Sequence, residues 1–412
     1  MLENWIGIAG IVVILAIAVL LSANRRAINL RVAGAALALQ VALAALVLYF
    51  EWGKRAILAL SNGVQAVIDY SAAGIDMVFG PLAGESVGFS FAVNVLPIVI
   101  FFSALMSVLY HLRIMQWIVK LVGGGLQKVI GTDPVESLNA AANIFVGQTE
   151  APLVIKPYLH KLTEPQLFAI MVSGVASVAG TVLAAYVFMG AELQYLLAAS
   201  FMAAPGGLLM AKILIPDTET LSADVTAVAS AGELQMEGSQ HANLILAAAV
   251  GASDGLRLAV NIGAMLIAFV ALIALFNGVV GGIAGWFGFE GVTLQMLLGK
   301  LFKPLMFLLS VPWNEAELSG ALFGEKLILN EFVAFSHLGE YLAGASERTV
   351  AVTTFALCGF ANLSSIAILL GGLGSLVPEK KEMIARFGLR AVAAGSLSNL
   401  MSAALAGLLL SF

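Results

Sequence analysis

Apolar runs long enough to cross a lipid bilayer recur along almost the whole chain. A helix needs about 20 mostly apolar residues to span the hydrocarbon core. Eight runs meet this requirement: 5–22, 31–50, 89–110, 165–189, 191–215, 256–282, 349–377 and 388–411. Because 60% of the 412 residues are hydrophobic and 11% are charged, the chain lacks the polar surface that a soluble protein of this length needs. The predicted fold class is an all-α integral membrane protein with eight transmembrane helices.

The charges that flank the first run predict its orientation. Glu3 precedes the run and Arg25, Arg26 and Arg31 follow it, which is the reverse of a cleaved signal peptide. Because positive charges favour the cytoplasmic side, we expect the N-terminus outside and the first loop inside. An even number of spans then places both termini on the external side.

Three further segments are too polar to be read as spans. Residues 54–79 and 114–130 alternate apolar and polar groups at helical spacing, with Trp52 and Trp117 near their starts. This pattern is typical of helices that lie in the membrane interface. The long polar stretch 217–240 is predicted to be a cytoplasmic linker.

Composition also argues against several other classes of protein. The formal charge is −5 and no run of lysine or arginine suggests a nucleic-acid partner. A single cysteine, Cys358, excludes an intramolecular disulfide framework. The histidines do not fall at zinc-ligand spacing, so a metalloenzyme has little support; they are His111, His160, His241 and His337.

The segment 133–160 predicts a helical hairpin rather than a span. Asp133, Pro134 and Glu136 form a helix-start signature, and a polar stretch at 147–152 follows about 13 residues later. Such a helix covers roughly 20 Å, short of the ~30 Å hydrocarbon core. We therefore expect the segment to enter and leave the membrane on one side, with its polar tip near the middle. The segment 313–343 repeats this plan.

Each predicted hairpin precedes a span that is interrupted by small and polar residues, at 173–181 and at 353–365. The order hairpin, broken span, span therefore occurs twice, once starting inside and once outside. Inverted repeats with interrupted helices are typical of secondary transporters, whose site lies where the repeats meet. The predicted division is 1–130 (scaffold and interfacial helices), 131–216 (transport repeat 1), 217–300 (cytoplasmic linker, interfacial helix and scaffold helix) and 301–412 (transport repeat 2).

Two glutamates, Glu150 and Glu331, occupy the predicted hairpin tips. A carboxylate at bilayer depth costs at least ~2.5 kcal/mol and is retained mainly where it has a task. The alternative is that the two side chains cap the half-helices, since buried backbone ends need partners. Gln148 offers both donors and an acceptor and so suits the edge of a planar base.

Further polar groups near the second break suit a sugar. A glutamate carboxylate accepts strong hydrogen bonds from the hydroxyls of a sugar. Asn362 and Ser365 would complete a sugar site around it. Phe360 either packs on a ring or fills the core. The hydroxyls of Ser177, Ser364 and Ser365 have the alternative of bonding back to the carbonyl four residues earlier.

A coupling-ion site combines hard oxygen donors with carbonyls that are freed by breaks in helices. Asn143 lies one turn before the first hairpin tip, and Ser177 lies inside the first broken span. The carbonyls of Val146 and Val178 are placed to join them.

Three motifs resemble the signature of the concentrative nucleoside transporters: 147–151 (Gly-Gln-Thr-Glu-Ala), 330–334 (Asn-Glu-Phe-Val-Ala) and 359–365 (Gly-Phe-Ala-Asn-Leu-Ser-Ser). Order, spacing and topology agree over about the whole chain, and the eight-span length resembles the bacterial branch. The resemblance implies no enzyme activity but nucleoside import by cation symport, with sodium favoured. It also implies elevator-type alternating access, a homotrimer and a place in the bacterial inner membrane.

The resemblance also implies roles for individual residues. Carried over by motif, the base is faced by Gln148, Thr149 and Glu150. The ribose is held by Glu331, Asn362 and Ser365. Phe360 lies beside the nucleoside and Val182 flanks the base. The implied sodium ligands are Asn143, Ser177 and the carbonyls of Val146 and Val178, and a carbonyl ligand does not depend on the side chain at 178.

Three rival functions remain open at this point. Some bacterial members of the family use protons instead of sodium. An intramembrane hydrolase would use Glu150 and Glu331 as an acid/base pair, although no nucleophile motif accompanies them. A channel fits less well, since hairpins that open to opposite sides suit alternating access.

Overall fold

The protein is all-helical, as predicted. The structure is a computed structural model that describes residues 2–84, 88, 90–217 and 242–411, and no strand occurs within these ranges. Seven helical segments are long and apolar enough to cross a membrane: Leu30–Leu48, Glu51–Ala83, Phe91–His111, Glu164–Phe188, Leu193–Leu214, Leu244–Trp286 and Pro378–Leu409. Six of the eight predicted spans coincide with members of this set.

The other two predicted spans, 5–22 and 349–377, are not among the seven segments. The first falls in α1 (Leu2–Leu20), of which the apolar part Ile6–Leu20 is short. The predicted span 349–377 is interrupted, as its small and polar residues suggested. The predicted linker at 217–240 lies almost wholly outside the described residues, which resume at residue 242.

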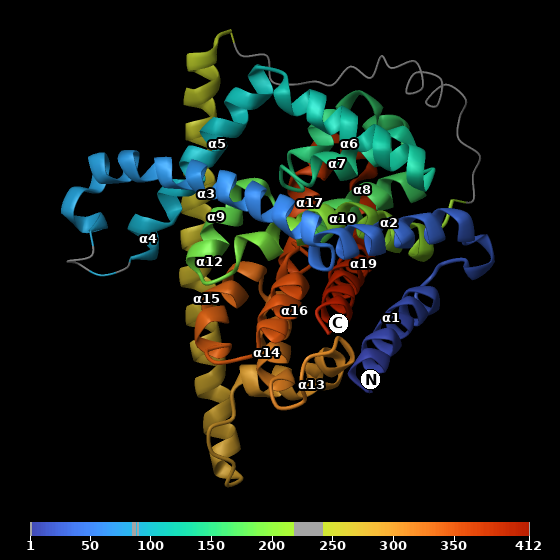
Figure 1. Ribbon diagram of the computed structural model, residues 1–412. Coiled ribbons are helices and arrows are strands. Elements are labelled where there is room, and N and C mark those ends of the chain that lie inside the picture. Colours follow the sequence, from blue (N-terminus) through green and yellow to red (C-terminus); the bar gives the residue numbers. More distant parts are fainter. Residues whose placement is uncertain (1, 85–87, 89, 218–241, 412) are drawn as a thin grey trace.

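The first third of the chain, which is the predicted scaffold, forms helices around the edge of the molecule (Figure 1). They are α1, η1 (Arg25–Ala27), α2 (Leu30–Leu48), α3 (Glu51–Phe79), η2 (Gly80–Ala83), α4 (Phe91–Asn94), α5 (Leu96–His111) and α6 (Ile114–Ile130). The predicted interfacial helix 114–130 coincides with α6. The other, 54–79, lies in α3, which by length and composition qualifies as a span. Because α3 buries only one narrow stripe, which includes Ile57, Ile68 and Ile75, a position in the membrane interface remains the prediction for residues 54–79. It also remains the prediction for α6.

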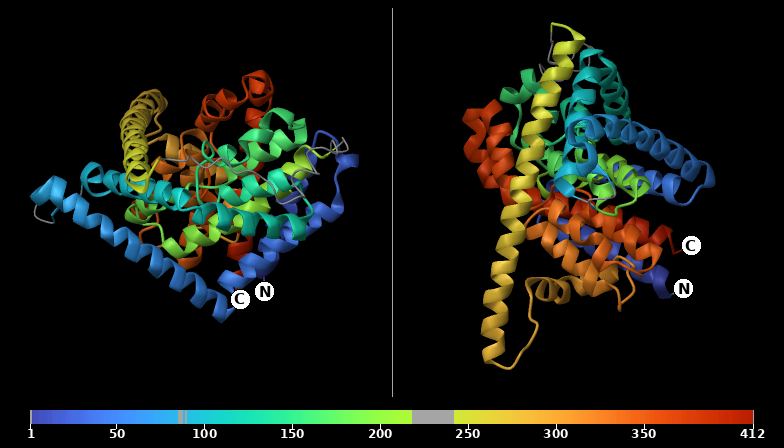
Figure 2. Two further views of the ribbon diagram at one scale, coloured as in Figure 1. Left: turned by 90° about the horizontal axis from the view of Figure 1, so that it is seen from above. Right: turned by 90° about the vertical axis from the view of Figure 1, so that its left-hand side faces the viewer.

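The predicted scaffold also includes α12 (Leu244–Trp286), which has 43 residues and extends over about 64 Å at 1.5 Å per residue. In Figures 1 and 2 it runs along one side of the molecule, past both repeats. It packs closely on α5 through two glycines. A Cβ on Gly251 would lie 2.6 Å from the Ser107 Cβ, and one on Gly255 would lie 2.7 Å from the Ile100 Cα. Only glycine permits this approach.

The two predicted repeats follow one another with the same order of elements. The first contains α7 (Pro134–Ala142), η3 (Ala151–Lys161), α8 (Glu164–Ala176), α9 (Gly180–Phe188) and α10 (Leu193–Leu214). After α12 and α13 (Leu294–Leu308), the second contains α14 (Ala316–Ile328), α15 (Glu331–Tyr341), α16 (Glu347–Leu357), α17 (Ser364–Gly371), α18 (Leu373–Leu376), η4 (Pro378–Lys380) and α19 (Lys381–Leu409). Hairpin 1 (α7 and η3) and hairpin 2 (α14 and α15) lie toward opposite ends of α12 (Figure 1).

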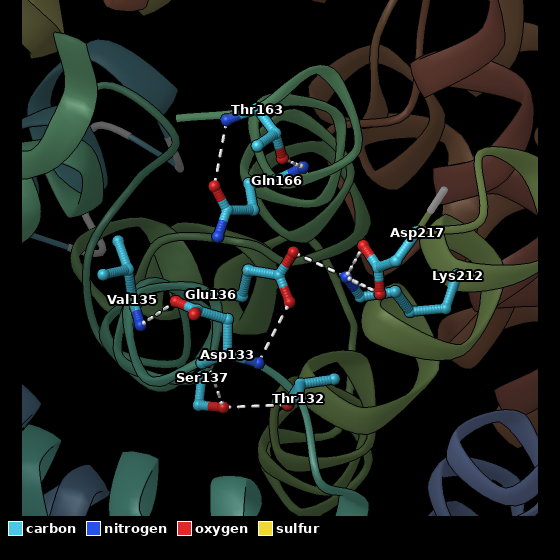
Figure 3. A network of polar contacts seen from close by, with 9 residues as sticks. All are labelled: Thr132, Asp133, Val135, Glu136, Ser137, Thr163, Gln166, Lys212 and Asp217. Atoms are coloured by element: carbon cyan, nitrogen blue, oxygen red, sulfur yellow. Dashed lines mark hydrogen bonds and ion pairs between the residues drawn. The ribbon is translucent and has the colours of Figure 1, made fainter. Parts of the chain in front are cut away.

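The base of hairpin 1 confirms the helix-start signature. The Asp133 carboxylate accepts from the Val135 N–H at 2.9 Å, and the Glu136 carboxylate accepts from the Asp133 N–H at 3.3 Å. Figure 3 shows that Glu136 also meets Lys212 of α10, at 2.7 Å, and that Lys212 in turn meets Asp217. The ammonium of Lys212 is therefore buried but paired with two carboxylates.

Burial separates the repeats from the scaffold. We compare the share of buried residues in the apolar stretch of each membrane-spanning segment. It is 89% in Glu164–Phe188, 94% in Leu193–Leu214 and 83% in Pro378–Leu409, but only 17% in Leu244–Trp286. The repeats are thus a packed core, whereas α12 presents most of its apolar surface outward. The start of α1 and the end of α19 lie close together, since a Cβ on Gly7 would lie 3.3 Å from the Leu408 Cβ.

Candidate functional site

The two broken helices cross where each is interrupted. The Phe360 N–H donates to the Ser177 carbonyl at 3.1 Å, which joins the break between α16 and α17 to that between α8 and α9. Gly359 makes the crossing possible, because a Cβ there would lie 2.7 Å from the Ala176 carbonyl oxygen. Each half-helix thus ends beside the other repeat, near the centre of the core.

Each hairpin is joined to the broken helix of its own repeat by an equivalent bond. In repeat 1 the Gly180 N–H donates to the Phe145 carbonyl at 3.0 Å, and in repeat 2 the Leu363 N–H donates to the Leu327 carbonyl at 3.1 Å. Gly180 is required for this contact, since a Cβ would lie 2.7 Å from the Phe145 oxygen. The bonds hold both hairpin tips against the helix breaks.

A cavity of about 150 Å³ lies between the two tips, the two breaks and α12. All eight residues predicted to bind substrate line it: Gln148, Thr149, Glu150, Val182, Glu331, Phe360, Asn362 and Ser365. These positions are up to 217 residues apart in the chain, as the pair Gln148 and Ser365 illustrates. The structure therefore brings the predicted set together in one place, and the role of each member remains a prediction.

Glu331 is held in the cavity by two side chains. It is 3% exposed, and its carboxylate accepts from the Tyr186 hydroxyl at 3.1 Å and from the Asn362 amide at 2.9 Å. The cap of α15 is instead Asn330, whose side-chain oxygen accepts from the Val333 N–H at 3.0 Å. Capping of α15 by Asn330 leaves the Glu331 carboxylate oriented toward the site, where it lines the cavity.

Two buried amide side chains in the cavity each have one atom without a hydrogen-bond partner among the described residues. Gln148 donates to the Ser365 hydroxyl at 3.4 Å, but its side-chain oxygen has no partner among the described residues. The same holds for the side-chain nitrogen of Asn330. An unmade bond of this kind is costly unless a ligand completes it. The cavity thus offers one free acceptor and one free donor beside the carboxylate of Glu331.

Glu150 has more open surroundings. It precedes η3 without capping it, and its side chain is exposed. It lines both the cavity of the site and a neighbouring cavity of about 500 Å³ between hairpin 1, α5 and α12. Gly147 leaves room for its carboxylate, because a Cβ there would lie 2.5 Å from the Glu150 oxygen. The capping alternative is therefore wrong for Glu150.

The four residues predicted to hold a cation are all buried at the first break. Asn143 is 1% exposed and its side-chain oxygen has no partner. Neither the Val146 nor the Val178 carbonyl accepts a hydrogen bond from a described residue. The Ser177 hydroxyl bonds back to the Ser173 carbonyl at 3.1 Å, which is the alternative foreseen for it, and its oxygen can still accept. Three buried oxygens without donors on adjoining segments suit a hard cation.

Sequence reasoning missed several residues of the site. Tyr186 lies one turn after Val182 on α9, and its ring stacks on Phe335 with centroids 4.4 Å apart. On α12, Asn261 and Met265 face the cavity from the scaffold. The only available signals were a tyrosine and an asparagine within apolar spans, which is where polar groups tend to have functional partners.

Comparison with known proteins gives a consistent result. The family model described as "Na+ dependent nucleoside transporter" matches with its N-terminal part at residues 9–82 and its C-terminal part at residues 195–407. Between them, residues 92–193 match the model described as "Gate: Nucleoside recognition".

Individual relatives match over nearly the whole chain. The nucleoside permease NupC of Helicobacter pylori is 50% identical over 98% of both chains. The sodium/nucleoside cotransporter 1 of Rattus norvegicus is 38% identical over 99% of this chain and 64% of its own length. A solved structure of CNTnw in an inward-facing, substrate-bound state has 50% identity and a TM-score of 0.93, and the match covers 100% of this chain and 98% of that one.

Proposed function

The chain belongs to the sodium-dependent, or concentrative, nucleoside transporter family, and from that premise we propose that it imports nucleosides by symport with sodium. It is an integral membrane protein and not an enzyme, since the family consists of transporters. The intramembrane hydrolase is thereby set aside. The observation that carries the proposal is the cavity in which both tips and both breaks meet beside a buried carboxylate.

The chemistry of the cavity supports a nucleoside with a defined orientation. The carboxylate of Glu331 accepts from ribose hydroxyls, with Asn362 and Ser365 beside it. Gln148 and Thr149 face the base, and the unpartnered Gln148 oxygen accepts from it. Glu150 completes the polar edge at the first tip.

The nonpolar walls of the cavity complete this arrangement. Val182, which is 2% exposed, flanks the base, and Phe360 packs beside the nucleoside. Nonpolar walls with a few polar groups are typical of sites for small molecules.

Sodium is the coupling ion that the first break suits best. The oxygens of Asn143, Ser177, Val146 and Val178 are neutral, and such amide, hydroxyl and carbonyl groups do not take up a proton near neutral pH. They are, however, hard donors for a small cation. Proton coupling would instead have to use a carboxylate such as Glu150 or Glu331.

Alternating access follows an elevator scheme in this proposal. The packed repeats move as the transport domain, and the scaffold remains fixed in a homotrimer. Support comes from the outward apolar surface of the scaffold: the described spans at Glu51–Ala83 and Leu244–Trp286 are each only 17% buried. Both termini are external, and hairpin 1 opens to the cytoplasm.

Cysteine labelling tests the orientation. Cysteines introduced at Asp133 and Lys156 should react from the cytoplasm, and cysteines at Trp313 and Tyr341 from outside. The native Cys358 is 1% exposed and should give little background. Labelling of both hairpins from one face would contradict the inverted arrangement.

Uptake of radiolabelled nucleoside into proteoliposomes tests the function, with sodium and proton gradients imposed separately. We expect saturable accumulation that follows the sodium gradient, with the substrate chemically unchanged. Uptake that follows only the proton gradient would move the coupling to a carboxylate. Downhill flux with single-channel currents would point to a channel.

A further inference from the structure

A buried lysine lies next to the second hairpin tip and forms no ion pair with a carboxylate of the described residues. Lys326 belongs to the last turn of α14 and is 0% exposed. In the part of the chain that the structure describes, its ammonium forms no ion pair, whereas the buried Lys212 has two carboxylates. A buried charge requires strong compensation, so the groups around Lys326 must supply it in another form.

The ends of two half-helices supply this compensation. The Lys326 ammonium donates to the Ala356 carbonyl at 3.0 Å, in the last turn of α16, and to the Asn399 side-chain oxygen at 2.7 Å. The Asn399 amide donates in turn to the Ala176 carbonyl, which ends α8, at 2.7 Å and to the Cys358 carbonyl at 2.9 Å. Because the C-terminus of a helix carries a partial negative charge, two such ends beside one another attract a cation.

The same contacts fix the position of the Glu331 carboxylate, which is predicted to bind the substrate. Lys326 is bound to α16 before the break, and the next residue, Leu327, accepts from the Leu363 N–H beyond the break. Adjacent to Leu363, the Asn362 amide donates to Glu331 at 2.9 Å. Hairpin 2 is therefore attached on both sides of the break, a few residues from the carboxylate.

The equivalent place in hairpin 1 has no charge. The carbonyl that corresponds to Leu327 is that of Phe145, which is preceded by Ile144 and by Asn143. The Asn143 side-chain oxygen is buried and has no partner. In this register Lys326 corresponds to Ile144, so the bare oxygen of Asn143 and the ammonium of Lys326 lie one position apart, each within one turn of its tip contact.

We propose that Lys326 is a built-in cation of the second repeat, a positioning residue that acts with Asn399 to anchor hairpin 2 to both broken helices and so holds Glu331 and Asn362 in place for the substrate. This inference rests on the proposed function and deepens it. Since the ammonium is covalently attached, the anchoring of hairpin 2 does not require sodium, whereas that of hairpin 1 does.

The test compares Lys326→Met with Lys303→Met. Methionine keeps much of the stem and removes the charge. Lys303 is a matched control, because it is 21% exposed, pairs with Glu317 at 3.0 Å and does not line the cavity. Two constants are measured on purified protein: the nucleoside Kd by calorimetry at saturating sodium, and the sodium half-saturation by thermal shift without nucleoside.

For Lys326→Met we expect the nucleoside Kd to rise about tenfold or more while sodium half-saturation stays within about twofold of the wild type. Lys303→Met should change neither. A nucleoside Kd that stays within about twofold in Lys326→Met would overturn the proposal. So would equal weakening of both constants together with a lower melting temperature, because that pattern indicates a merely structural lysine.

Two further variants keep the test decisive if Lys326→Met does not fold. Lys326→Gln retains a donor and should give an intermediate nucleoside Kd. Asn399→Ser removes the donors to the Ala176 and Cys358 carbonyls and, because Ala176 adjoins Ser177, should weaken both constants. Unchanged constants in either variant would contradict the proposal. A wild-type protein that binds no nucleoside would instead refute the proposed function.

Discussion

The two hairpins have equivalent backbone contacts but opposite charge arrangements. Each tip accepts one backbone hydrogen bond from the broken helix of its repeat, at the Phe145 carbonyl in one and the Leu327 carbonyl in the other. Among the described residues, Asn143 beside the first tip has a side-chain oxygen without a donor, and Lys326 beside the second has an ammonium that forms no ion pair. In the proposed mechanism, the same backbone scheme is completed once by a mobile ion and once by a side chain.

This difference assigns different tasks to the two halves of the site. If sodium binds at the first tip as proposed, the order of Gln148 and Glu150 should depend on whether sodium is bound. Glu331 is held by the side chains of Tyr186 and Asn362, and neither contact involves an ion. Sodium and nucleoside should consequently tighten each other's binding through the first tip, as linkage requires.

The largest expected effect comes from removing the cation ligand of hairpin 1. With one sodium per neutral nucleoside, a potential of −100 mV contributes about 2.3 kcal/mol and a tenfold gradient adds ~1.4 kcal/mol. Together these sustain a concentration ratio of several hundredfold, on the order of 10^2.7. In Asn143→Leu we expect a folded protein whose accumulation ratio falls to about one. Retained sodium-driven accumulation in proteoliposomes would contradict the cation site.

The next effect concerns the fixed half of the site. Glu331→Gln keeps the shape but removes the charged acceptor, which weakens ribose binding by about 1.5–3 kcal/mol. The nucleoside Kd should rise roughly ten- to a hundredfold, with sodium dependence retained. Calorimetry on folded, trimeric protein measures this. Wild-type affinity would mean that the carboxylate does not bind the ribose.

Local signals in the sequence were enough to locate the hairpins and the breaks. The Asp133 and Glu136 signature predicted the capping box at the start of α7, because a cap depends on neighbours within one turn. The glycine and serine residues around 177 predicted where α8 ends and α9 begins. The motif at the second tip likewise placed Glu331 beside the second break.

Contacts between distant segments could not be predicted in this way. Lys326 and Asn399 are 73 residues apart, and Tyr186 and Glu331 are 145 apart. No periodicity links such pairs, since their meeting depends on how two repeats pack against each other. The sequence also could not decide where residues 54–79 lie. A helix with one buried stripe suits either the membrane interface or the edge of a scaffold.

A smaller effect is expected at Gln148, whose free oxygen faces the base. Gln148→Ala removes one neutral hydrogen bond, so binding weakens by about 0.5–1.5 kcal/mol, or roughly two- to tenfold. The loss should differ among nucleosides, because bases differ in the donors at their edge, and this changes their order of affinity. Competition assays with several nucleosides measure it. A uniform loss for all of them would place Gln148 away from the base.

The smallest effect is expected at Ser177, and it distinguishes a ligand from a structural hydroxyl. Ser177 already donates to the Ser173 carbonyl, so Ser177→Ala leaves Asn143 and the two freed carbonyls as cation donors. Loss of one neutral oxygen should raise the sodium half-saturation by about two- to fivefold. At saturating sodium, the nucleoside Kd should return to the wild-type value, because the fully loaded first tip has the same geometry. Ser364→Ala is a matched control in the second break, where Lys326 replaces the ion, and its sodium half-saturation should not change. If both variants shift the sodium curve equally, the two breaks share the mobile cation and the contrast between the hairpins is lost.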